Sequence, residues 1–189
     1  MRLILATRNV HKARELAALM TPHAIDALPP EIELPPETGK TFAENAMIKA
    51  RAAARATGRA AIADDSGIAA EALGGAPGVY SARYAGEDAT DEENLDKLLR
   101  EAPAGSALAY VCALAFVDPV DGTEHLVDGR CEGTLSARPR GSGGFGYDPA
   151  FVPLEHTDRT MAELSDDEKG AISHRGRAAQ ELRTWLAGR

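Results

Sequence analysis

Apolar and polar positions alternate along this chain in patterns that predict both strands and helices. Short apolar runs at residues 2–6 and 60–64 are typical of buried strands, the second ending on acidic residues. Two longer β-rich runs, at 107–118 and 124–136, are expected to be joined across residues 119–122 as a hairpin or meander. Because helical patterns interleave with strands at both ends while strands cluster in the middle, we expect an α/β fold with a mixed sheet flanked by helices.

Capping signals locate the helices between these strands. Thr41 and Glu44 have capping-box spacing, the run after them is rich in alanine, and Gly58 stands where a left-handed terminus is expected. This is the clearest helix of the sequence. Further helices are expected from about His11 to Met20, from Thr90 to about Arg100, from Ser165, and from Ser173 towards the end of the chain.

Proline and glycine mark the expected loops. The stretch from Pro22 to Pro36 carries five prolines and little periodicity, so it is expected to be a loop with at most a brief strand. Residues 73–86 contain too many glycines for a regular element, and an ordered loop is expected because Val79, Tyr80 and Tyr84 supply apolar surface for packing. Residues 138–149 are again expected to form a loop.

Composition and charge narrow the classes of function. A chain of 189 residues with 44% hydrophobic and 26% charged residues has ordinary globular composition and enough length for one well-buried core. Its formal net charge of -8 disfavours DNA or RNA as the main partner, because no basic stripe is visible. A mononucleotide needs only a few cations in one cleft and is therefore not excluded.

Neither a membrane segment nor a metal-binding cysteine motif is visible in the sequence. No run of about 18 or more apolar residues occurs and the first residues lack the pattern of an export signal, so we expect a soluble protein without a membrane partner. The two cysteines, Cys112 and Cys131, have no C-x-x-C spacing, which favours buried thiols in a reducing cytosol.

The segment ATRNVHK (residues 6–12) places polar groups where a strand end turns into a helix. Backbone N–H groups, the Thr7 and Asn9 side chains and the Lys12 ammonium are able to converge there on phosphate oxygens. The residues alone leave an equally good alternative, a solvated helix start with Asn9 as its N-cap.

The segment IADDSG (residues 62–67) puts two adjacent carboxylates at the end of a predicted strand. Open α/β sheets bind ligands at this position, and magnesium takes one or two carboxylates together with substrate phosphates. Adjacent strand residues face opposite sides, so Asp64 and Asp65 serve one metal only if the strand breaks near Asp65, which Gly67 would allow. A plain turn explains the same residues.

The segment PPETGKTFAENAMIK (residues 35–49) offers Glu37 before a glycine turn and Lys49 on the capped helix. Glu37 would complete a metal site, and Lys49 would meet a phosphate. Solvent exposure is the commoner outcome for a loop glutamate and a helical lysine, so the residues alone leave both roles open.

Two segments near the C-terminal end, GSGGFGYDP (141–149) and KGAISHRG (169–176), combine glycine-flanked aromatic residues with cations. A stacking surface, an acceptor and a cationic end wall would come from Phe145 and Tyr147, from Asp148, and from Lys169, His174 and Arg175. Core packing of the aromatic residues and a simple helix start are the alternatives. Cations gain nothing from the dipole at a helix start, which favours a functional reason for the last two.

Taken together, five segments resemble the inosine triphosphate pyrophosphatase family, also described as noncanonical purine nucleoside triphosphate pyrophosphatases. The resemblance spans almost the whole chain in family order: LATRNVHKARELAALM, ETGKTFAENAMIKARAAA, AIADDSGIAAEALGGAPGVYSARYAGEDATDEEN, GGFGYDPAF and AELSDDEKGAISHRGRAAQEL. A coincidence of five long motifs is very improbable, so functional roles are favoured at the matching residues. The family often has glycine where this chain has Arg8 and His11, and neither side chain is expected to be essential; Arg8 would face solvent or add a phosphate contact.

The resemblance implies a single domain over residues 1–189, with an elongated mixed β-sheet flanked by helices and two lobes around a nucleotide-binding cleft. It implies a cytoplasmic, magnesium-dependent hydrolase, commonly a homodimer, which converts ITP, dITP and XTP to monophosphate and pyrophosphate and so keeps them out of nucleic acids. Water would attack the α-phosphorus. Donors aimed at a 6-keto oxygen would disfavour adenine by about 1–3 kcal/mol, and His174 and Arg175 are the candidates.

Site residues are carried over from the resemblance one by one. Asp65 would accept the proton and, with Glu37, bind the metal, with Asp64 in support. Substrate contacts are expected from a phosphate-binding loop, from Lys49 and Ser66, and from the segments near the C-terminal end: Thr7, Arg8, Asn9, Val10, His11, Lys12, Lys49, Ser66, Phe145, Gly146, Tyr147, Asp148, Lys169, His174 and Arg175.

Three other functions are weighed against this one. A pyrophosphatase for modified pyrimidine or other nucleotides is disfavoured by the SHRG and FGYDP motifs. A nucleotide-binding regulator without turnover would have no need of Glu37, Asp64 and Asp65. A structural interaction module would leave the glycine-flanked aromatic residues and the cationic segment unexplained.

Overall fold

Six strands form one mixed sheet in the order β2-β1-β3-β4-β5-β6. The computed structural model describes all residues from Met1 to Arg189. β1 pairs in parallel with both β2 and β3, whereas β5 and β6 are antiparallel. The strands are β1 (Arg2–Leu5), β2 (Ala24–Ala27), β3 (Ala61–Ala70), β4 (Ala107–Val117), β5 (Glu124–Leu135) and β6 (Phe151–Pro153).

Helices flank this sheet, so the predicted α/β class is confirmed. They are α1 (Val10–Leu19), α2 (Phe42–Thr57), α3 (Asp91–Glu101), α4 (Asp166–Ile172) and α5 (His174–Ala187). The capping boxes expected at Thr90 and Ser165 are both present, and β2 is the brief strand expected in the proline-rich stretch. No helix is both long and apolar enough to cross a lipid bilayer.

The chain divides into two compact units, which are described separately. Unit 1 comprises residues 1–65, 112–129 and 175–189, and unit 2 comprises residues 66–111 and 130–174. The boundary passes between Asp65 and Ser66 and again between His174 and Arg175, so it falls within two predicted site motifs. The single domain expected over the whole chain stays a prediction.

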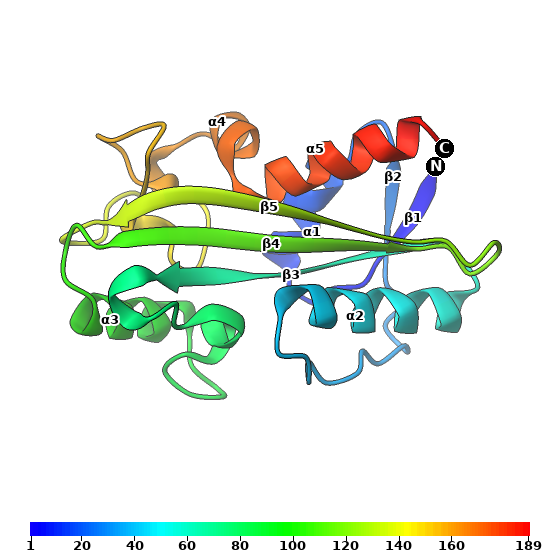
Figure 1. The fold of residues 1–189 in the computed structure, drawn as a ribbon, viewed down its shortest axis with the longest axis horizontal. Helices are drawn as coiled ribbons and strands as arrows, with labels where there is room; N and C mark the ends of the chain where they lie inside the picture. The colour runs from blue at the N-terminus through cyan, green and yellow to red at the C-terminus, as the bar shows by residue number, and fades with distance from the viewer. The chain divides into compact units, whose positions relative to one another are not determined.

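Strand alternation gives unit 1 two separate apolar layers. Leu3, Leu5 and Ile62 pack with α1 and α5 on one face of the sheet, while Ile4 and Ala63 pack with α2 on the other face. Figure 1 shows α5 and α2 on opposite sides of the strands. Residues with even and odd numbers along β3 therefore point to different helices, which decides where the two aspartates go.

Helix α2 lies close to the sheet because its buried face is built from small side chains, among them Ala46, Ala50 and Ala53. The Thr41 hydroxyl accepts from the Glu44 N–H at 3.1 Å and so closes the first turn. Gly58 ends the helix in the left-handed conformation, with φ of 64°. The expected helix is therefore confirmed at both ends.

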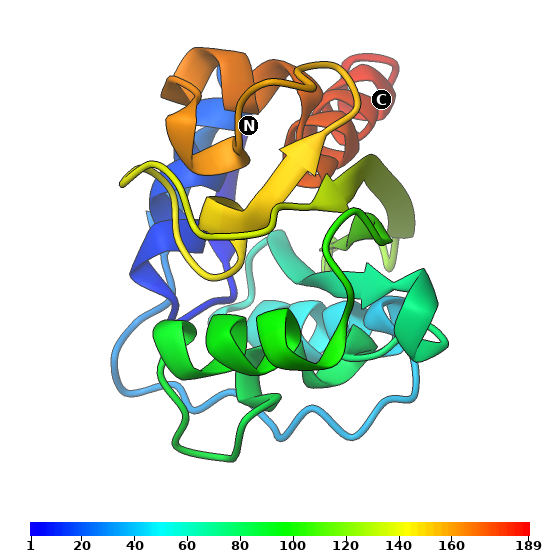
Figure 2. The same cartoon turned by 90° about the vertical axis from the view of Figure 1, so that its left-hand side faces the viewer.

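Unit 2 packs α3 and the segment around α4 against its part of the strands. Leu95 and Leu98 of α3 belong to the same apolar cluster as Phe151 and Met161. Figure 2 shows α3 (green) and α4 (orange) on opposite sides of the sheet. This unit is therefore layered like unit 1, with its own core.

The expected end of the strand at residue 64 is wrong, because β3 continues as far as Ala70. Gly67 does not break the strand. It instead lets the Ser81 hydroxyl come close, since a Cβ atom at position 67 would collide with this side chain. The Ser81 hydroxyl accepts from the Ile68 N–H at 2.9 Å. A contact between distant segments therefore keeps the strand regular.

The glycine-rich stretch 73–86 is ordered, as expected, and residues Gly78–Arg83 form a short 3-10 helix. Ser81 is buried and anchors this turn, whereas the Tyr80 residue is 59% exposed. The expectation that Tyr80 packs inside is thus wrong, while Tyr84 does pack against the core of unit 2.

Candidate active site

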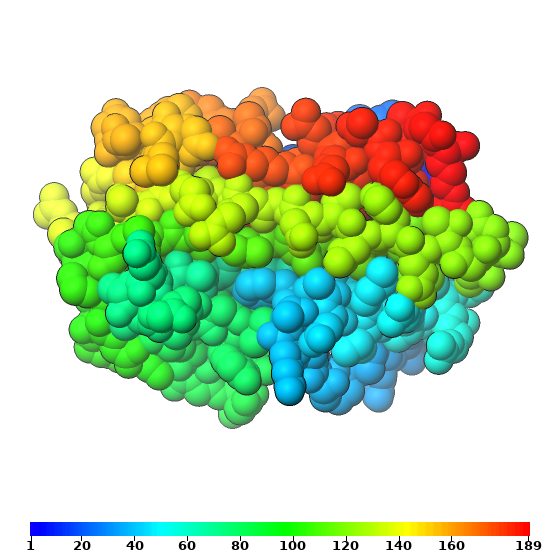
Figure 3. All heavy atoms as spheres, in the orientation of Figure 1, coloured from blue at the N-terminus to red at the C-terminus, as the bar shows by residue number.

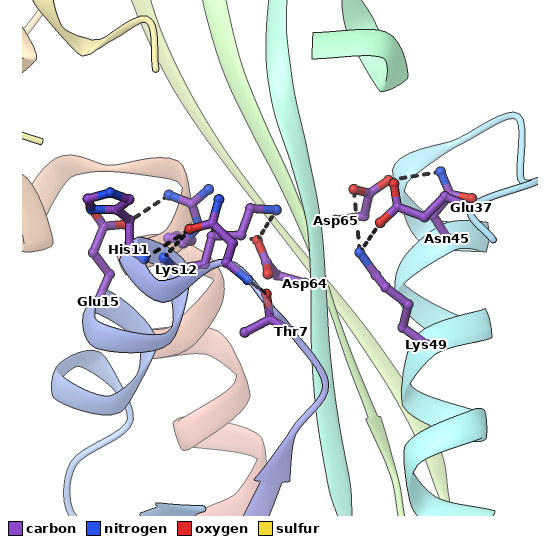
Figure 4. A network of polar contacts seen from close by, with 11 residues as sticks. Thr7, His11, Lys12, Glu15, Glu37, Asn45, Lys49, Asp64 and Asp65 are labelled. Atoms are coloured by element: carbon purple, nitrogen blue, oxygen red, sulfur yellow. Dashed lines mark hydrogen bonds and ion pairs between the residues drawn. The ribbon is translucent and has the colours of Figure 1, made fainter. Parts of the chain in front are cut away.

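Asp64 and Asp65 extend from opposite faces of β3 within unit 1. Figure 4 shows Asp64 turned towards Lys12 and Asp65 turned towards Asn45 and Lys49. The strand break that would bring both carboxylates to one metal does not occur, because β3 stays extended through these positions. The adjacent aspartates therefore belong to two different groups of charges.

Asp64 joins two cations. Its Oδ2 atom lies 3.1 Å from the Lys12 Nζ and 3.2 Å from the Arg175 Nε. The other end of the Arg175 guanidinium lies 2.8 Å from the Glu15 carboxylate. Burial alone would raise the pKa of Asp64, but the charges of Lys12 and Arg175 outweigh it and hold this pKa well below the ordinary value. Asp64 is therefore a permanent anion that fixes both cations.

Asp65 lies in a different electrostatic environment on the α2 side. Its Oδ2 accepts from the Asn45 Nδ2 at 2.9 Å, and its Oδ1 lies 3.7 Å from the Lys49 Nζ. Burial raises the pKa of Asp65 above its ordinary value, Glu37 adds to the rise, and Lys49 opposes it. A buried aspartate with a raised pKa suits a proton acceptor.

Lys49 is the centre of this second group. Its ammonium also forms an ion pair with Glu37, whose side chain is part-exposed. Burial would lower the pKa of Lys49, but Asp65, Asp64 and Glu37 outweigh it and raise this pKa. Glu37 and Lys49 are therefore not separate surface residues, and the solvent-exposed alternative does not hold for either.

The start of α1 has a capped geometry. The Asn9 Oδ1 accepts from the backbone N–H groups of His11 and Lys12 at 2.9 and 3.0 Å, and the Thr7 hydroxyl accepts from the Asn9 N–H. The N-cap alternative thus describes Asn9. The Lys12 ammonium forms an ion pair with Asp64. The Val10 side chain is exposed.

Arg8 is an exposed residue whose guanidinium nevertheless has partners within the protein. Its guanidinium donates to the backbone carbonyls of Leu28 and Pro29 at 2.9 and 2.8 Å, and also to the carbonyl of Ile32. The expected solvent exposure is confirmed, the contacts with these carbonyls were not predicted, and a phosphate contact stays a prediction. Arg8 ties the loop before α1 to the proline-rich stretch.

In unit 2, Asp148 is the centre of a buried clamp. It accepts from the Tyr110 hydroxyl at 3.0 Å, from the Phe145 N–H at 2.9 Å and from the Lys169 Nζ at 2.7 Å. The Lys169 ammonium also lies 5.1 Å from the centroid of the Phe145 ring. Asp148 is 3% exposed, so its acceptor capacity holds the Phe145 loop in place.

Aromatic residues of this loop have different positions. Tyr147 belongs to the apolar core of unit 2, and its hydroxyl donates to the Ser81 carbonyl at 2.7 Å. The expectation that Tyr147 offers a stacking face is therefore wrong, because its ring is buried. Phe145 is half-buried and remains the candidate for stacking on a base, while the Gly146 N–H donates to Asp91 at 2.9 Å.

His174 has a fixed ring orientation. Its imidazole stacks on the Tyr110 ring with centroids 4.6 Å apart and an interplanar angle of 10°. Both side chains are buried. Tyr110 therefore positions both His174, through its ring, and Asp148, through its hydroxyl.

Ser66, the first residue of unit 2, is half-buried on β3.

Three residues of these groups were not predicted from the sequence: Glu15, Asn45 and Tyr110. Helix spacing contained a signal for two of them, because Glu15 lies three residues after Lys12 and Asn45 lies four residues before Lys49, which places each pair on one helix face. Tyr110 gave no comparable signal, since an aromatic residue in a strand usually packs in a core.

The sequence matches known proteins along nearly its whole length. A family model described as the Ham1 family matches residues 3–185. A relative from Streptomyces avermitilis, named dITP/XTP pyrophosphatase, is 50% identical over 194 residues, which covers 96% of this chain and 94% of the relative. A relative of the same name from Escherichia coli K12 is 48% identical over 190 residues, covering 96% of this chain and 95% of the relative.

Solved structures with the same fold carry related names. A HAM1 protein from Coxiella burnetii has a TM-score of 0.87 and 42% sequence identity, and the match covers 100% of both chains. A structure from Mycobacterium abscessus, described as a nucleoside-triphosphatase and dITP/XTP pyrophosphatase, has a TM-score of 0.74 and 44% identity, with 96% and 98% of the two chains covered.

Proposed function

This chain belongs to the Ham1 family, and we propose that it hydrolyses the noncanonical purine nucleotides ITP, dITP and XTP to the monophosphate and pyrophosphate. It is a nucleoside triphosphate pyrophosphatase, a hydrolase acting on a phosphoanhydride bond. The observation that carries the proposal is the group of Glu37, Lys49 and Asp65, which combines hard oxygen ligands with a buried base. The names of the relatives support the choice of substrates.

Glu37 and Asp65 are assigned as the ligands of a magnesium ion. Their fit is supported by their arrangement in unit 1, where both carboxylates direct oxygens to one positive charge, the Lys49 ammonium. No group of three or more His, Cys, Asp or Glu side chains is arranged to hold a metal ion, and magnesium commonly combines one or two carboxylates with water and substrate phosphates. When bound, the ion would neutralise charge on the phosphate oxygens.

Asp65 is assigned as the proton acceptor. The oxygen of a water molecule forms a bond to the α-phosphorus as the bond from this phosphorus to the bridging oxygen breaks, and the electron pair leaves with pyrophosphate. The water proton passes to the Asp65 carboxylate. Burial raises the pKa of Asp65 in the protein without metal, and a bound magnesium ion would lower it again. Asn45 holds the second carboxylate oxygen and thereby orients the first.

The negative charge of the triphosphate would be neutralised by three cations, Lys12, Lys49 and Arg175. Asp64 keeps the Lys12 and Arg175 cations together on one face of β3. Burial would lower the pKa of Arg175, but the charges of Asp64 and Glu15 outweigh it and raise this pKa, so the guanidinium stays charged. Fixed cations of this kind stabilise charge that develops on the leaving oxygen.

Recognition of the base is assigned to unit 2. Phe145 supplies the stacking face, while His174 supplies a ring N–H donor for the 6-keto oxygen, with Tyr110 fixing the plane of the imidazole. A donor directed at the amino group of adenine would stay unpaired, which disfavours ATP by about 1–3 kcal/mol. Contacts from Ser66, Gly146 and the loop before α1 remain predictions.

We further propose that the protein forms a homodimer and acts in the cytoplasm. The cytoplasm holds the nucleotide pool on which such an enzyme acts, and removal of these nucleotides would prevent their incorporation into nucleic acids. Cys112 and Cys131 are both buried and form no disulfide, which agrees with a reducing compartment. Size-exclusion chromatography with light scattering would test the dimer.

Turnover of ITP, XTP, dITP, ATP and GTP in the presence of magnesium tests the proposed reaction. Chromatography should detect monophosphate and pyrophosphate from the inosine and xanthosine nucleotides, with ATP and GTP cleaved poorly. In water enriched in oxygen-18, the label should enter the monophosphate and not the pyrophosphate. Single release of orthophosphate, or label in pyrophosphate, would exclude attack at the α-phosphorus.

A further inference from the structure

The Arg8 side chain occupies a cluster of backbone carbonyls in unit 1. Its Nη1 donates to the Leu28 carbonyl at 2.9 Å, and its Nη2 donates to the carbonyls of Pro29 and Ile32, with the Pro30 carbonyl 3.4 Å away. A guanidinium presents several N–H donors in a fixed planar fork, which suits such a set of converging acceptors. The contact is therefore specific to arginine.

Local sequence explains why these carbonyls converge. Pro29 and Pro30 have no N–H group, so this stretch lacks two of the donors that a regular sheet or helix would need. Residues from Leu28 to Lys40 contain no helix or strand, and part of this segment (blue) lies at the surface on the face shown in Figure 3. Within the segment the Ile32 N–H donates to the Pro29 carbonyl at 3.1 Å, and Arg8 adds donors to the carbonyls of Leu28, Pro29 and Ile32.

Glu37 lies between two anchors on this segment. At the far end, the Asn45 Oδ1 accepts from the Gly39 N–H at 2.7 Å, and the same amide donates to Asp65. At the near end, Arg8 holds residues 28–32. Ile32 and Leu34 pack against the α2 layer between the two. The position of Glu37 thus depends on both anchors.

We infer that Arg8 is a positioning residue, which holds the 28–40 segment so that Glu37 is in place for the reaction. The inference rests on the proposed function, in which Glu37 binds the magnesium ion. Arg8 stands between Thr7 and Asn9, whose turn fixes its backbone, so the loop that begins α1 and the segment bearing Glu37 form one connected structure. The role inferred for Arg8 is exerted through this segment, which carries Glu37.

Hydrogen–deuterium exchange of the full-length protein without nucleotide or metal tests whether Arg8 holds the 28–40 segment. Arg8→Ala should speed exchange of the amides at residues 31–34 and 37–40 by about fivefold or more, because hydrogen bonds to a charged donor are lost. Arg8→Lys should give an intermediate rate, since an ammonium lacks the planar fork. Arg55→Ala, an exposed arginine on α2, is the matched control and should exchange like the wild type.

Kinetics of ITP hydrolysis test whether this contact keeps Glu37 in place for the reaction. Arg8→Ala should raise the half-saturating magnesium concentration and lower kcat about threefold to tenfold, while KM for ITP at saturating magnesium stays unchanged. Arg8→Lys should recover part of the loss, and Arg55→Ala should match the wild type.

Two results would overturn the inference. Unchanged exchange together with a raised KM for ITP would show that Arg8 is a phosphate ligand. Faster exchange without any change in magnesium dependence would show an anchor with no role in the reaction. If the wild type itself cleaves no purine triphosphate, the proposed function fails, whereas the exchange rates still decide whether Arg8 holds the segment.

Discussion

Asp64 and Asp65 show how environment separates two identical side chains. They are adjacent in sequence, but the alternation of β3 directs one to the cations of α1 and α5 and the other to Asn45 and Lys49 of α2. The pKa of Asp64 is held low and that of Asp65 is raised. Because burial acts on both in the same direction, the different balance of neighbouring charges separates the two pKa values, and this difference supports the proposal that Asp65 is the base.

Tyr110 has a role that depends on a single hydroxyl. Tyr110→Phe keeps the ring that stacks on His174 but removes the donor to the Asp148 carboxylate. A buried acceptor is then left with one partner fewer, so the free energy of unfolding should fall by about 1–3 kcal/mol. KM for ITP should rise more than kcat falls. Urea denaturation and steady-state kinetics measure the two effects.

The matched change for Tyr110→Phe is Tyr84→Phe, which removes a more exposed tyrosine hydroxyl in the same unit. It should leave KM for ITP unchanged. Equal KM values for Tyr110→Phe and the wild type would show that the hydroxyl does not position the base-binding group.

At the scale of elements, α2 determines the geometry of the proposed metal site. It presents Asn45 and Lys49 one turn apart on the same face, and its alanine face brings them close to β3. Its start and end are set by Thr41 and Gly58. The integrity of this helix is therefore linked to the arrangement of Asp65.

Removal of the α2 cap should destabilise the protein. Thr41→Ala leaves the Glu44 N–H without its acceptor, and the free energy of unfolding should fall by about 1 kcal/mol. Thermal or urea unfolding measures the change. Thr38→Ala, at an exposed position in the preceding loop, serves as the control, and an equal loss in both variants would contradict a specific capping role.

Glu168 in the capping box of α4 should make stability depend on pH. Hydrogen bonds from Arg159 and from Ser165 lower the pKa of Glu168 from 4.5 to about 2. Because the folded pKa lies below the ordinary value, the stabilisation is complete above about pH 4.5 and is lost as the pH falls towards 2. Titration of the carboxyl carbon by NMR measures this pKa.

The variant Glu168→Gln tests the same linkage by unfolding. It should be less stable than the wild type at pH 7, and the difference should shrink as the pH approaches 2. A stability difference that stays constant across this range would show that ionisation of Glu168 does not contribute.

Sequence alone predicted the features that depend on local interactions. The caps of α2, α3 and α4 follow from residues three positions apart, and the structure contains all of them. The length of β3 was not predicted, and core packing of Tyr147 stood only as an alternative, because both depend on contacts with Ser81 from a distant segment. The partners of Arg8 were missed for the same reason.

At the scale of the whole molecule, the chain combines an acidic surface with local groups of cations. The net charge of -8 opposes binding of a long polyanion. Lys12, Lys49 and Arg175 are nevertheless concentrated in unit 1 beside carboxylates that hold them in place. A small, highly charged nucleotide coordinated to magnesium suits this combination better than DNA or RNA does.

The most direct test compares magnesium-dependent ITP hydrolysis by the wild type and Asp65→Asn, with Asp96→Asn on α3 as the matched control. We expect a folded Asp65→Asn protein whose kcat is lower by about 100-fold to 10,000-fold, the usual contribution of a general base, while Asp96→Asn retains full activity. Circular dichroism would confirm that both variants are folded. Full activity of Asp65→Asn would contradict the assignment of Asp65 as the proton acceptor and of the Glu37, Lys49 and Asp65 group as the catalytic centre.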